Sequence, residues 1–254
     1  MARVLRGDRL PCARCALCIV CASFFIGIPH SWAESPPGPP LGDHATRVID
    51  ELSPPWNAVG QVNVGGYRRR MECTGSLIAP NVVITAAHCV MDPWRKQPHS
   101  KNEIHFVAGV RGSNSLGHST AKCLHFSSEY EFGSQSTSAD IVLITLSDDL
   151  NDIPPAELNH TEVDSSDLAL VHAAYLADRR YVLTGQFGCR LKAQQDNLWL
   201  TDCDVHPASS GGPVFIQTNE GLKLAAIMVG VTNSGSIAVR IAKWMESSAL
   251  RNCP

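Results

Sequence analysis

The chain has 254 residues, of which 44% are hydrophobic and 18% are charged, and its formal net charge is −3. This composition is typical of one compact globular protein, and beyond the N-terminus there is no run of about eighteen apolar residues that would indicate a membrane-spanning helix. The sequence has no basic cluster that would indicate binding to nucleic acid or to an anionic membrane, so we expect neither partner.

Residues 1–33 are predicted to be a signal peptide. Four arginines precede an apolar run from Cys15 to Ile28, and the small residues Ser31 and Ala33 stand three and one positions before a cut ahead of Glu34. We therefore expect a secreted or periplasmic protein with no stable membrane anchor after cleavage. The mature chain then has 17 Lys and Arg against 23 Asp and Glu, a formal charge of −6.

Four cysteines of the predicted signal peptide recur at every third position, a spacing similar to an iron–sulfur ligand run. They are Cys12, Cys15, Cys18 and Cys21. The last gap is one residue short of the ferredoxin pattern, and no proline follows it. An iron–sulfur protein is therefore a minor alternative, which would require a visible chromophore, and we expect neither a cofactor nor a metal.

Beyond the signal peptide, residues 34–46 are rich in proline and glycine and are predicted to be an extended linker or a short pro-segment. Short alternating or β-branched runs follow, separated by turn residues, which favours antiparallel barrels. The first set comprises residues 58–64, 74–78, 82–86, 103–110, 121–126 and 141–146. The second comprises residues 167–173, 180–184, 198–203, 213–217, 222–231 and 236–241.

Only the last segment has helical spacing. Ile241, Trp244, Met245 and Ala249 fall on one face, which predicts a short C-terminal helix. Six cysteines remain after the signal peptide, and an even number in an exported chain indicates disulfides, with free buried thiols as the alternative.

Three motifs carry candidate chemistry. Ser210 precedes Gly-Gly-Pro, which predicts a hydroxyl presented on a tight turn; His88 lies in Thr-Ala-Ala-His-Cys; and Asp140 begins an apolar run. A serine needs a base to remove its proton, and histidine has a suitable pKa. A carboxylate can then fix the imidazole tautomer and stabilise the imidazolium.

In this order, the motifs Thr-Ala-Ala-His-Cys, Asp-Ile-Val-Leu-Ile-Thr-Leu and Ser-Gly-Gly-Pro resemble those of the trypsin-like (chymotrypsin-fold) serine peptidases, most closely the secreted bacterial members. The resemblance implies two antiparallel six-stranded barrels, residues 47–155 and 156–254, with the active site in the cleft between them. It implies that His88, Asp140 and Ser210 form the catalytic triad and that the backbone N–H groups of Ala208 and Ser210 form the oxyanion hole.

The same resemblance implies a Cys73–Cys89 disulfide beside the histidine. We expect Cys189–Cys203 to close the loop ahead of the nucleophile, which leaves Cys123 and Cys253 as the third pair.

The chain departs from the family at two positions beside the nucleophile, where Gly-Asp-Ser becomes Ala208-Ser209-Ser210. If the first position requires a positive φ, alanine would cost about 1–2 kcal/mol or flip the peptide. The second change removes the carboxylate that receives the new N-terminus in trypsin, so cleavage at Arg47 could not use that ion pair. The family's substrate-binding Ser-Trp-Gly corresponds to roughly residues 228–230 and lacks both its serine and its tryptophan.

The sequence thus predicts a monomeric serine endopeptidase acting on proteins or peptides. The alternative is a catalytically silent binding protein on the same fold. Asp204 stands six residues before Ser210, where family members that prefer Lys or Arg carry the acid of their primary pocket. Cys203 directly precedes it, unlike in trypsin, so a solvated turn residue is the alternative for Asp204.

Overall fold

A computed structural model describes most of the chain from Thr46 onwards, namely residues 46–65, 71–131, 137–159, 161, 163, 168–242, 245 and 253. Contacts divide the chain into a unit of residues 1–37 and a unit of residues 38–254, and everything described belongs to the second unit. The predicted signal peptide, and the Pro-rich segment apart from its last residue, lie outside the described residues.

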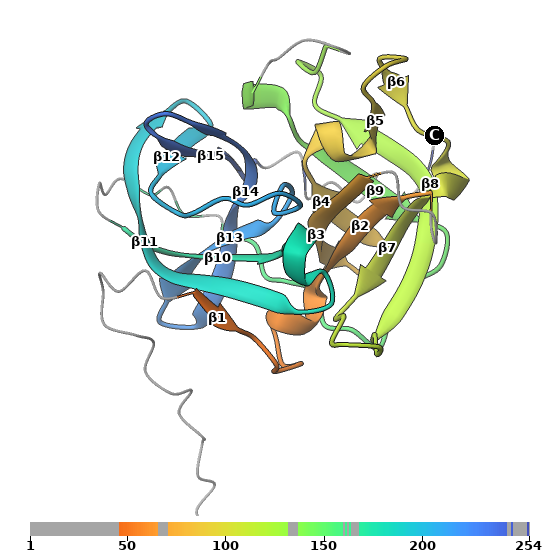
Figure 1. Cartoon of the computed structure of the whole chain (residues 1–254), viewed down its shortest axis with the longest axis horizontal. Coiled ribbons are helices and arrows are strands. Elements are labelled where there is room, and N and C mark those ends of the chain that lie inside the picture. The colour runs from red at the N-terminus through yellow and green to blue at the C-terminus, as the bar shows by residue number, and fades with distance from the viewer. Residues whose placement is uncertain are drawn as a thin grey trace, which may run out of the picture. The chain divides into compact units, whose positions relative to one another are not determined.

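The first half of the described chain forms a closed antiparallel barrel with the strand order β2-β3-β4-β9-β8-β7 (Figure 1). Its strands are β2 (Val59–Val64), β3 (Met71–Ala79), β4 (Val82–Thr85), β7 (Ile104–Ala108), β8 (Gly117–Phe126) and β9 (Val142–Leu146). Strands β4 and β9 are rich in β-branched residues and buried throughout, which suits a pleated surface packed on both sides.

The second half forms another antiparallel barrel in the order β11-β10-β13-β14-β15-β12, which a pairing between β11 and β12 closes. Its strands are β10 (Ala169–Tyr175), β11 (Leu183–Gln195), β12 (Leu198–Thr201), β13 (Pro213–Thr218), β14 (Gly221–Thr232) and β15 (Gly235–Arg240). The short strand β1 (Thr46–Val48) pairs with β11 and extends this sheet by one strand.

The remaining described elements are short. A hairpin pairs β5 (Met91–Asp92) with β6 (Gln97–Pro98). The single-turn 3-10 helices are η1 (Trp56–Ala58), η3 (Ala87–Val90), η4 (Lys101–Glu103), η5 (Thr137–Ala139) and η6 (Ala177–Arg179). Within the part of the chain that is described, no helix has the length and apolarity needed to span a bilayer. The predicted C-terminal helix falls mostly on residues outside that part, including Trp244 and Ala249.

The two-barrel, all-β fold expected from the sequence is confirmed, and each predicted run overlaps one observed strand. The largest difference is β11, predicted over residues 180–184 but extending over Leu183–Gln195. Its last four residues are exposed, and all but Ala193 are polar, so they lack the apolar alternation that marks a strand. A tight turn at Asp196, with φ 54°, returns the chain into β12.

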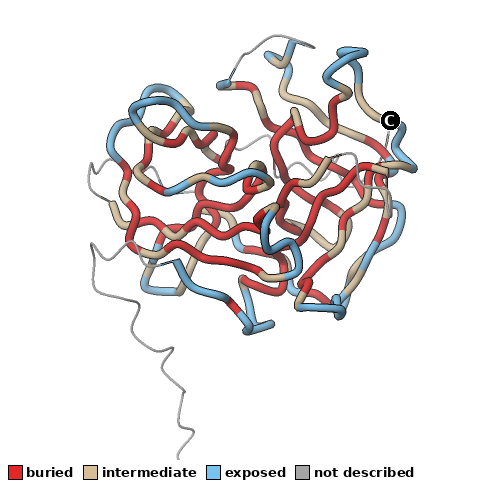
Figure 2. The backbone as a smooth tube through the Cα atoms, viewed as in Figure 1, coloured by how far each residue is buried: buried red, intermediate tan, exposed pale blue. Residues whose placement is uncertain are grey.

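One hydrophobic core cluster contains residues of both barrels. In Figure 2 the buried segments, coloured red, are the strands in the interior of the backbone trace. Trp56 packs edge-on against Phe215 and Phe187 of the second barrel, at centroid distances of 5.6 and 6.1 Å. The buried Tyr175 at the end of β10 donates its hydroxyl toward the carbonyl oxygen of Val59 in β2, 3.3 Å away. This shared core fixes the ends of β2, β3 and β10 next to one another.

The six cysteines of the predicted mature chain are joined in the three expected pairs. They are Cys73–Cys89, Cys123–Cys253 and Cys189–Cys203.

Candidate active site

His88 lies in η3, directly after β4, and is paired with Asp140 in the segment between η5 and β9. One carboxylate oxygen of Asp140 lies 2.6 Å from His88 Nδ1, and the other accepts a hydrogen bond from the His88 backbone N–H at 2.8 Å. The His88 side chain is 39% exposed, whereas that of Asp140 is 16% exposed. The acid is thus largely shielded and the imidazole remains accessible, with Nδ1 committed to Asp140.

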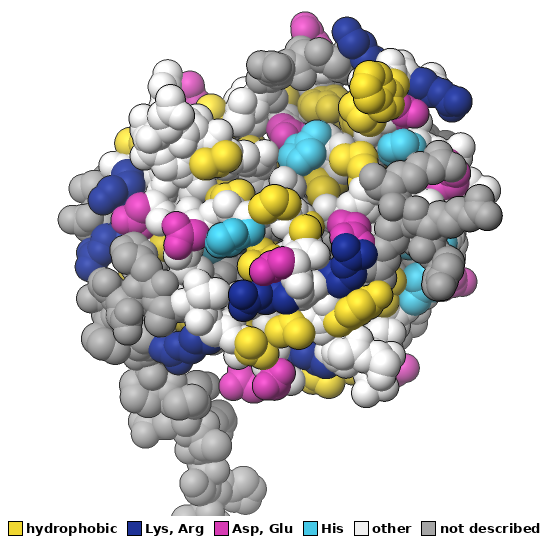
Figure 3. Space-filling view, in the orientation of Figure 1, with side chains coloured by type: hydrophobic (Ala, Val, Ile, Leu, Met, Phe, Trp, Pro, Cys, Tyr) yellow, Lys and Arg dark blue, Asp and Glu magenta, His cyan; other side chains and the backbone are white. Residues whose placement is uncertain are grey.

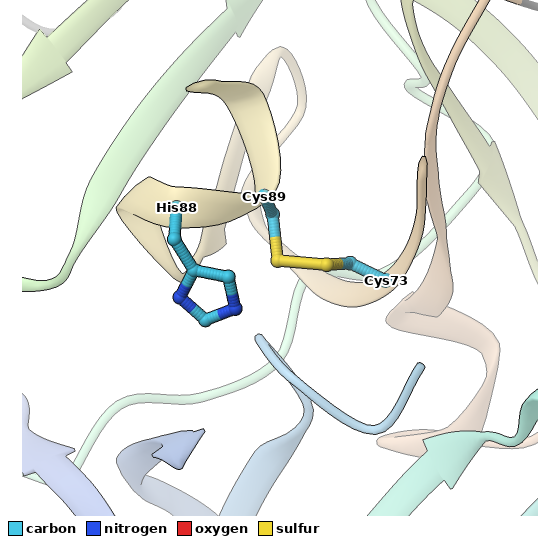
Figure 4. A group of neighbouring side chains, drawn as sticks. All are labelled: Cys73, His88 and Cys89. Carbon is cyan, nitrogen blue, oxygen red and sulfur yellow. A yellow bond between two sulfur atoms is a disulfide. The ribbon is translucent and has the colours of Figure 1, made fainter. Parts of the chain in front are cut away.

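The Cys73–Cys89 disulfide lies beside the imidazole (Figure 4). The two sulfur atoms and a ring nitrogen of His88 lie within 4.8 Å of one another, a grouping with metal-ligand chemistry. The sulfurs are bonded to each other, however, so neither is a thiolate that could hold an ion. We therefore interpret the disulfide as the link that fixes the short helix η3 to β3.

The turn that carries Ser210 is bonded to the first barrel at the same place. The backbone N–H of Thr74, next to Cys73, donates to the Ser210 carbonyl oxygen at 2.8 Å. On the other side, Gly211 N–H donates to the Met228 carbonyl oxygen of β14 at 2.7 Å. Ser210 is therefore held between β3 and β14, and β3 also carries the disulfide that flanks His88.

Gly211 allows this docking. It has φ 77°, and a Cβ there would lie 2.0 Å from Thr85 Oγ1 and 2.1 Å from the Thr74 carbonyl oxygen. Only a glycine fits this contact, because both the backbone conformation and the space exclude a side chain.

Ala208 adopts a positive φ of 74°, the conformation on which the sequence-based expectation of strain depended. The Pro207 carbonyl oxygen accepts a hydrogen bond from Ala177 N–H at 2.9 Å, so the Pro207–Ala208 peptide directs the Ala208 N–H away from that contact. Within the described residues, neither Ala208 N–H nor Ser210 N–H donates to another backbone group. Two unused donors on one tight turn are what an oxyanion hole requires.

Ser209 is 1% exposed and is bonded within the turn. Its hydroxyl donates to the His206 carbonyl oxygen at 2.6 Å and accepts from the His206 N–H at 3.3 Å. Ser209 N–H donates to the same carbonyl at 3.0 Å. These bonds fix the segment from residue 206 to residue 209 without a carboxylate.

Thr74 connects this turn to both barrels. Its buried hydroxyl accepts a hydrogen bond from Tyr175 N–H at 3.0 Å and lies 3.3 Å from the Ala208 carbonyl oxygen. No sequence pattern distinguished Thr74, because a threonine in a strand is ordinary; the bonds of Ser209 were equally invisible in the sequence.

Asp204 is exposed. Its carboxylate accepts a hydrogen bond from Gln186 Nε2 at 3.0 Å, and its backbone N–H donates to Gln186 Oε1 at 2.6 Å. This is the solvated arrangement that was the alternative to a buried pocket acid. The role of Asp204 in binding Lys or Arg stays a prediction.

His172 of β10 lies against the turn that carries Ser210. A Cβ on Gly212 would meet its Cε1 at 2.8 Å, and its Nδ1 lies 3.1 Å from the Pro213 carbonyl oxygen. Burial lowers the pKa of His172 to about 4, although the hydrogen bond to Pro213 opposes the shift. His172 is therefore neutral at pH 7.

These features define a two-barrel serine peptidase fold. A glutamyl endopeptidase, solved in complex with MPD, superimposes with a TM-score of 0.68 at 18% sequence identity, over 81% of this chain and 94% of that one. The family model of the trypsin-like peptidase domain matches residues 73–222. The chain belongs to this family.

Two curated relatives are proteases. A modular serine protease of Drosophila melanogaster is 29% identical over 120 residues, 44% of this chain and 18% of its own length. A peroxisomal leader peptide-processing protease of Mus musculus is 26% identical over 205 residues, 76% of this chain and 30% of its own length. The chain thus spans less than a third of the length of either relative.

Proposed function

We propose that the chain is a secreted serine endopeptidase that hydrolyses proteins or peptides through His88, Asp140 and Ser210. The observation that carries this proposal is the pairing of Asp140 with His88: both carboxylate oxygens are used, one on Nδ1 and one on the backbone N–H. A carboxylate bound in this way fixes the imidazole orientation and stabilises its protonated form.

In the proposed mechanism, His88 Nε2 takes the Ser210 hydroxyl proton as Oγ attacks the scissile carbonyl carbon. The resulting oxyanion is bound by the N–H groups of Ala208 and Ser210. When the C–N bond breaks, imidazolium His88 gives its proton to the leaving amine, and an acyl-enzyme remains on Ser210. Water then attacks the ester with His88 again as base, which releases the acid and regenerates the serine. No step requires a cofactor.

Three disulfides favour an oxidising compartment, in agreement with the predicted export. We therefore infer a secreted or periplasmic protein; the monomeric state stays a prediction from the sequence.

A catalytically silent binding protein is the second candidate, because Ala208 and Ser209 stand where the family has Gly-Asp before the serine. Ala208 nevertheless adopts a positive φ, and its N–H donates to no other backbone group among the described residues, which favours the enzyme.

A fluorophosphonate probe tests the proposal on the mature protein. We expect covalent labelling that Ser210→Ala abolishes and that Asp140→Asn slows by about four orders of magnitude, because the wrong imidazole tautomer forms. Asp149→Asn, a change at an exposed acid in the turn after β9, is the matched control and should label like wild type. Absence of labelling at every pH would favour the silent protein.

A further inference from the structure

Two histidines face each other on the outer surface of the first barrel. His105 lies in β7 and His118 in β8, and the register of these strands pairs His105 with Thr120 and Val107 with His118. The histidines are therefore diagonal neighbours on one face of the sheet, because opposite residues of an antiparallel pair point to the same side. Phe106, between His105 and Val107, points inward and is buried. The name His105–His118 pair is used for the two histidines below.

The two imidazole rings meet at their nitrogen-bearing edges. His105 Nδ1 lies 2.9 Å from His118 Nε2, whereas the ring centroids are 5.2 Å apart and the ring planes differ by 17°. A neutral imidazole has one N–H and one lone pair, so one ring of the pair donates a hydrogen bond and the other accepts it. A single proton thus lies between two nitrogens that are both able to bind a metal ion.

The surroundings of the pair suit a cation. Burial of His105, and then the charge that His118 would carry, lower the pKa of His105, which favours its neutral, lone-pair form. The residues opposite the pair in the neighbouring strands are uncharged: Asn63 of β2 and Thr120 of β8 oppose His105, and Val107 opposes His118. No lysine or arginine therefore stands directly opposite either histidine to repel a bound ion.

The separation of the two nitrogens matches that of two ligands on one metal ion. Bonds from zinc to histidine nitrogen are about 2.0–2.1 Å long, and with bonds of this length two nitrogens lie about 2.9 Å apart at a right angle and about 3.3 Å apart at the tetrahedral angle. The observed 2.9 Å between His105 Nδ1 and His118 Nε2 corresponds to the right angle. Square-planar and tetragonal sites of nitrogen and oxygen ligands are typical of Cu²⁺ and Ni²⁺, and Cu²⁺ binds most tightly among the divalent metals of this series.

The pair is accessible from solvent. His118 is exposed and His105 is partly buried, so the two nitrogens can turn toward an ion that arrives from outside the barrel. In the space-filling view, a histidine lies toward the right-hand side of the face, over β7 and β8 (Figure 3). Among the described residues, no third His, Cys, Asp or Glu gathers with the pair into a larger group of ligands. Water would therefore complete the coordination.

We propose that the His105–His118 pair is a surface site for a divalent late transition metal ion, with Cu²⁺ preferred, in which His105 Nδ1 and His118 Nε2 are adjacent ligands. When the ion binds, the hydrogen between the two nitrogens moves to the far nitrogen of the ring that carried it. Both lone pairs then point at the metal and both rings stay neutral. The bound ion joins β7 to β8 on the outside of the barrel.

The site is separate from the proposed triad and does not depend on the proposed function. It differs from the expectation of no metal that the sequence supported. No sequence pattern indicated the pair, because the two histidines are 13 positions apart and only the register of β7 and β8 brings them together.

The test titrates the mature protein, without an affinity tag, with Cu²⁺ by isothermal calorimetry and records electron paramagnetic resonance spectra of the bound ion. We expect a binding step whose spectrum shows coupling to two imidazole nitrogens. His105→Gln and His118→Gln should each lose this step, because glutamine keeps a hydrogen-bonding amide but has no imidazole nitrogen to offer the metal. Thermal unfolding without metal confirms that both variants are folded.

His125→Ala is the matched control. His125 lies in the same strand as His118, but its Nε2 lies 2.9 Å from Thr145 Oγ1 and faces no second histidine in that contact. The variant should bind Cu²⁺ as wild type does and give the same spectrum. Unchanged Cu²⁺ binding in the two glutamine variants would show that the ion is held elsewhere and would overturn the inference, as would a wild-type protein that binds no Cu²⁺.

Discussion

At the scale of single residues, the conformation of Ala208 decides how the departure from the family motif is interpreted. An L-residue at positive φ costs about 1–2 kcal/mol, yet the structure holds Ala208 there. The hydrogen bond from Ala177 N–H to the Pro207 carbonyl oxygen and the contact of the Thr74 hydroxyl with the Ala208 carbonyl oxygen favour this conformation on both sides. These neighbouring contacts offset the backbone strain at Ala208, so the strain does not by itself imply that the candidate oxyanion hole fails to form.

Ala208→Gly should therefore stabilise the protein. Glycine removes the strain of the positive φ but has a larger conformational entropy in the unfolded chain, which offsets part of the gain. The unfolding free energy should therefore rise by up to about 1 kcal/mol. Labelling by the fluorophosphonate should be retained or faster. Denaturant unfolding measures the first quantity. A destabilised variant would mean that the positive φ is not the preferred state of this turn.

Ser209→Ala should slow labelling about tenfold through a change in turn geometry. The variant loses both side-chain hydrogen bonds to His206, each worth about 1 kcal/mol, while Ser209 N–H still bonds to the His206 carbonyl. We interpret Ser209 as a positioning residue, so kcat should fall more than KM rises, and Ser209→Thr should restore part of the rate. Ser128→Ala, at an exposed serine, is the control; equal rates for both alanine variants would argue against this role.

At the scale of elements, the proposed activity depends on the docking of the turn that carries Ser210 onto β3 and β4. The backbone hydrogen bond from Thr74 to Ser210 and the tight contact at Gly211 form this interface. Each barrel contributes one part of the site, so neither sheet alone assembles it.

Gly211→Ala tests this docking. Its Cβ would overlap Thr85 Oγ1 and the Thr74 carbonyl oxygen, so we expect a loss of about 3 kcal/mol or more in unfolding free energy and no labelling. Gly112→Ala is the matched control, because Gly112 has a similar φ of 61° with nothing within 4 Å of its Cβ. It should lose only the conformational cost of about 1–2 kcal/mol. Similar losses of unfolding free energy in both variants would show that the contact of Gly211 with β3 and β4 has room for a side chain.

At the scale of the whole molecule, the shared core and the disulfide from Cys123 to Cys253 connect distant parts of the chain. The same burial that packs the second barrel also makes stability depend on pH, through His172. The pKa of His172 is lowered from 6.5 to about 4 by desolvation, so the unfolded state binds more protons in the range between these values.

The contribution of His172 to stability is therefore complete above pH 6.5 and is lost as pH falls through about 4. The full loss is about 3 kcal/mol, since one pKa unit corresponds to about 1.4 kcal/mol. His172→Asn keeps a donor for the Pro213 carbonyl without a titrating group, so its unfolding free energy should fall less between pH 6.5 and 4. Urea unfolding of both proteins at several pH values measures the difference. Parallel curves would contradict the neutral, buried state of His172.

The sequence by itself determined which candidate catalytic groups are present and which type of fold to expect. Three motifs marked His88, Asp140 and Ser210 as candidate catalytic residues because base, acid and hydroxyl occur in distinctive local settings. Alternating runs separated by turns predicted an antiparallel barrel, and the family resemblance implied two of them. The sequence also predicted an even set of disulfides. The sequence did not predict strand ends such as that of β11, because exposed hairpin residues need no apolar pattern.

Only the tertiary structure decided the contacts between residues far apart in the chain. The bonds of Thr74 in β3 to Tyr175 and Ala208 and the ion pair between Glu72 and Arg180 depend on how the two sheets meet. The exposure of Asp204 depends on the contact of its loop with Gln186 of β11. The same holds for Ala208, whose φ is fixed by hydrogen bonds to the neighbouring segments. A local pattern can reveal which groups are present, but their distances and burial arise only when the barrels share one core.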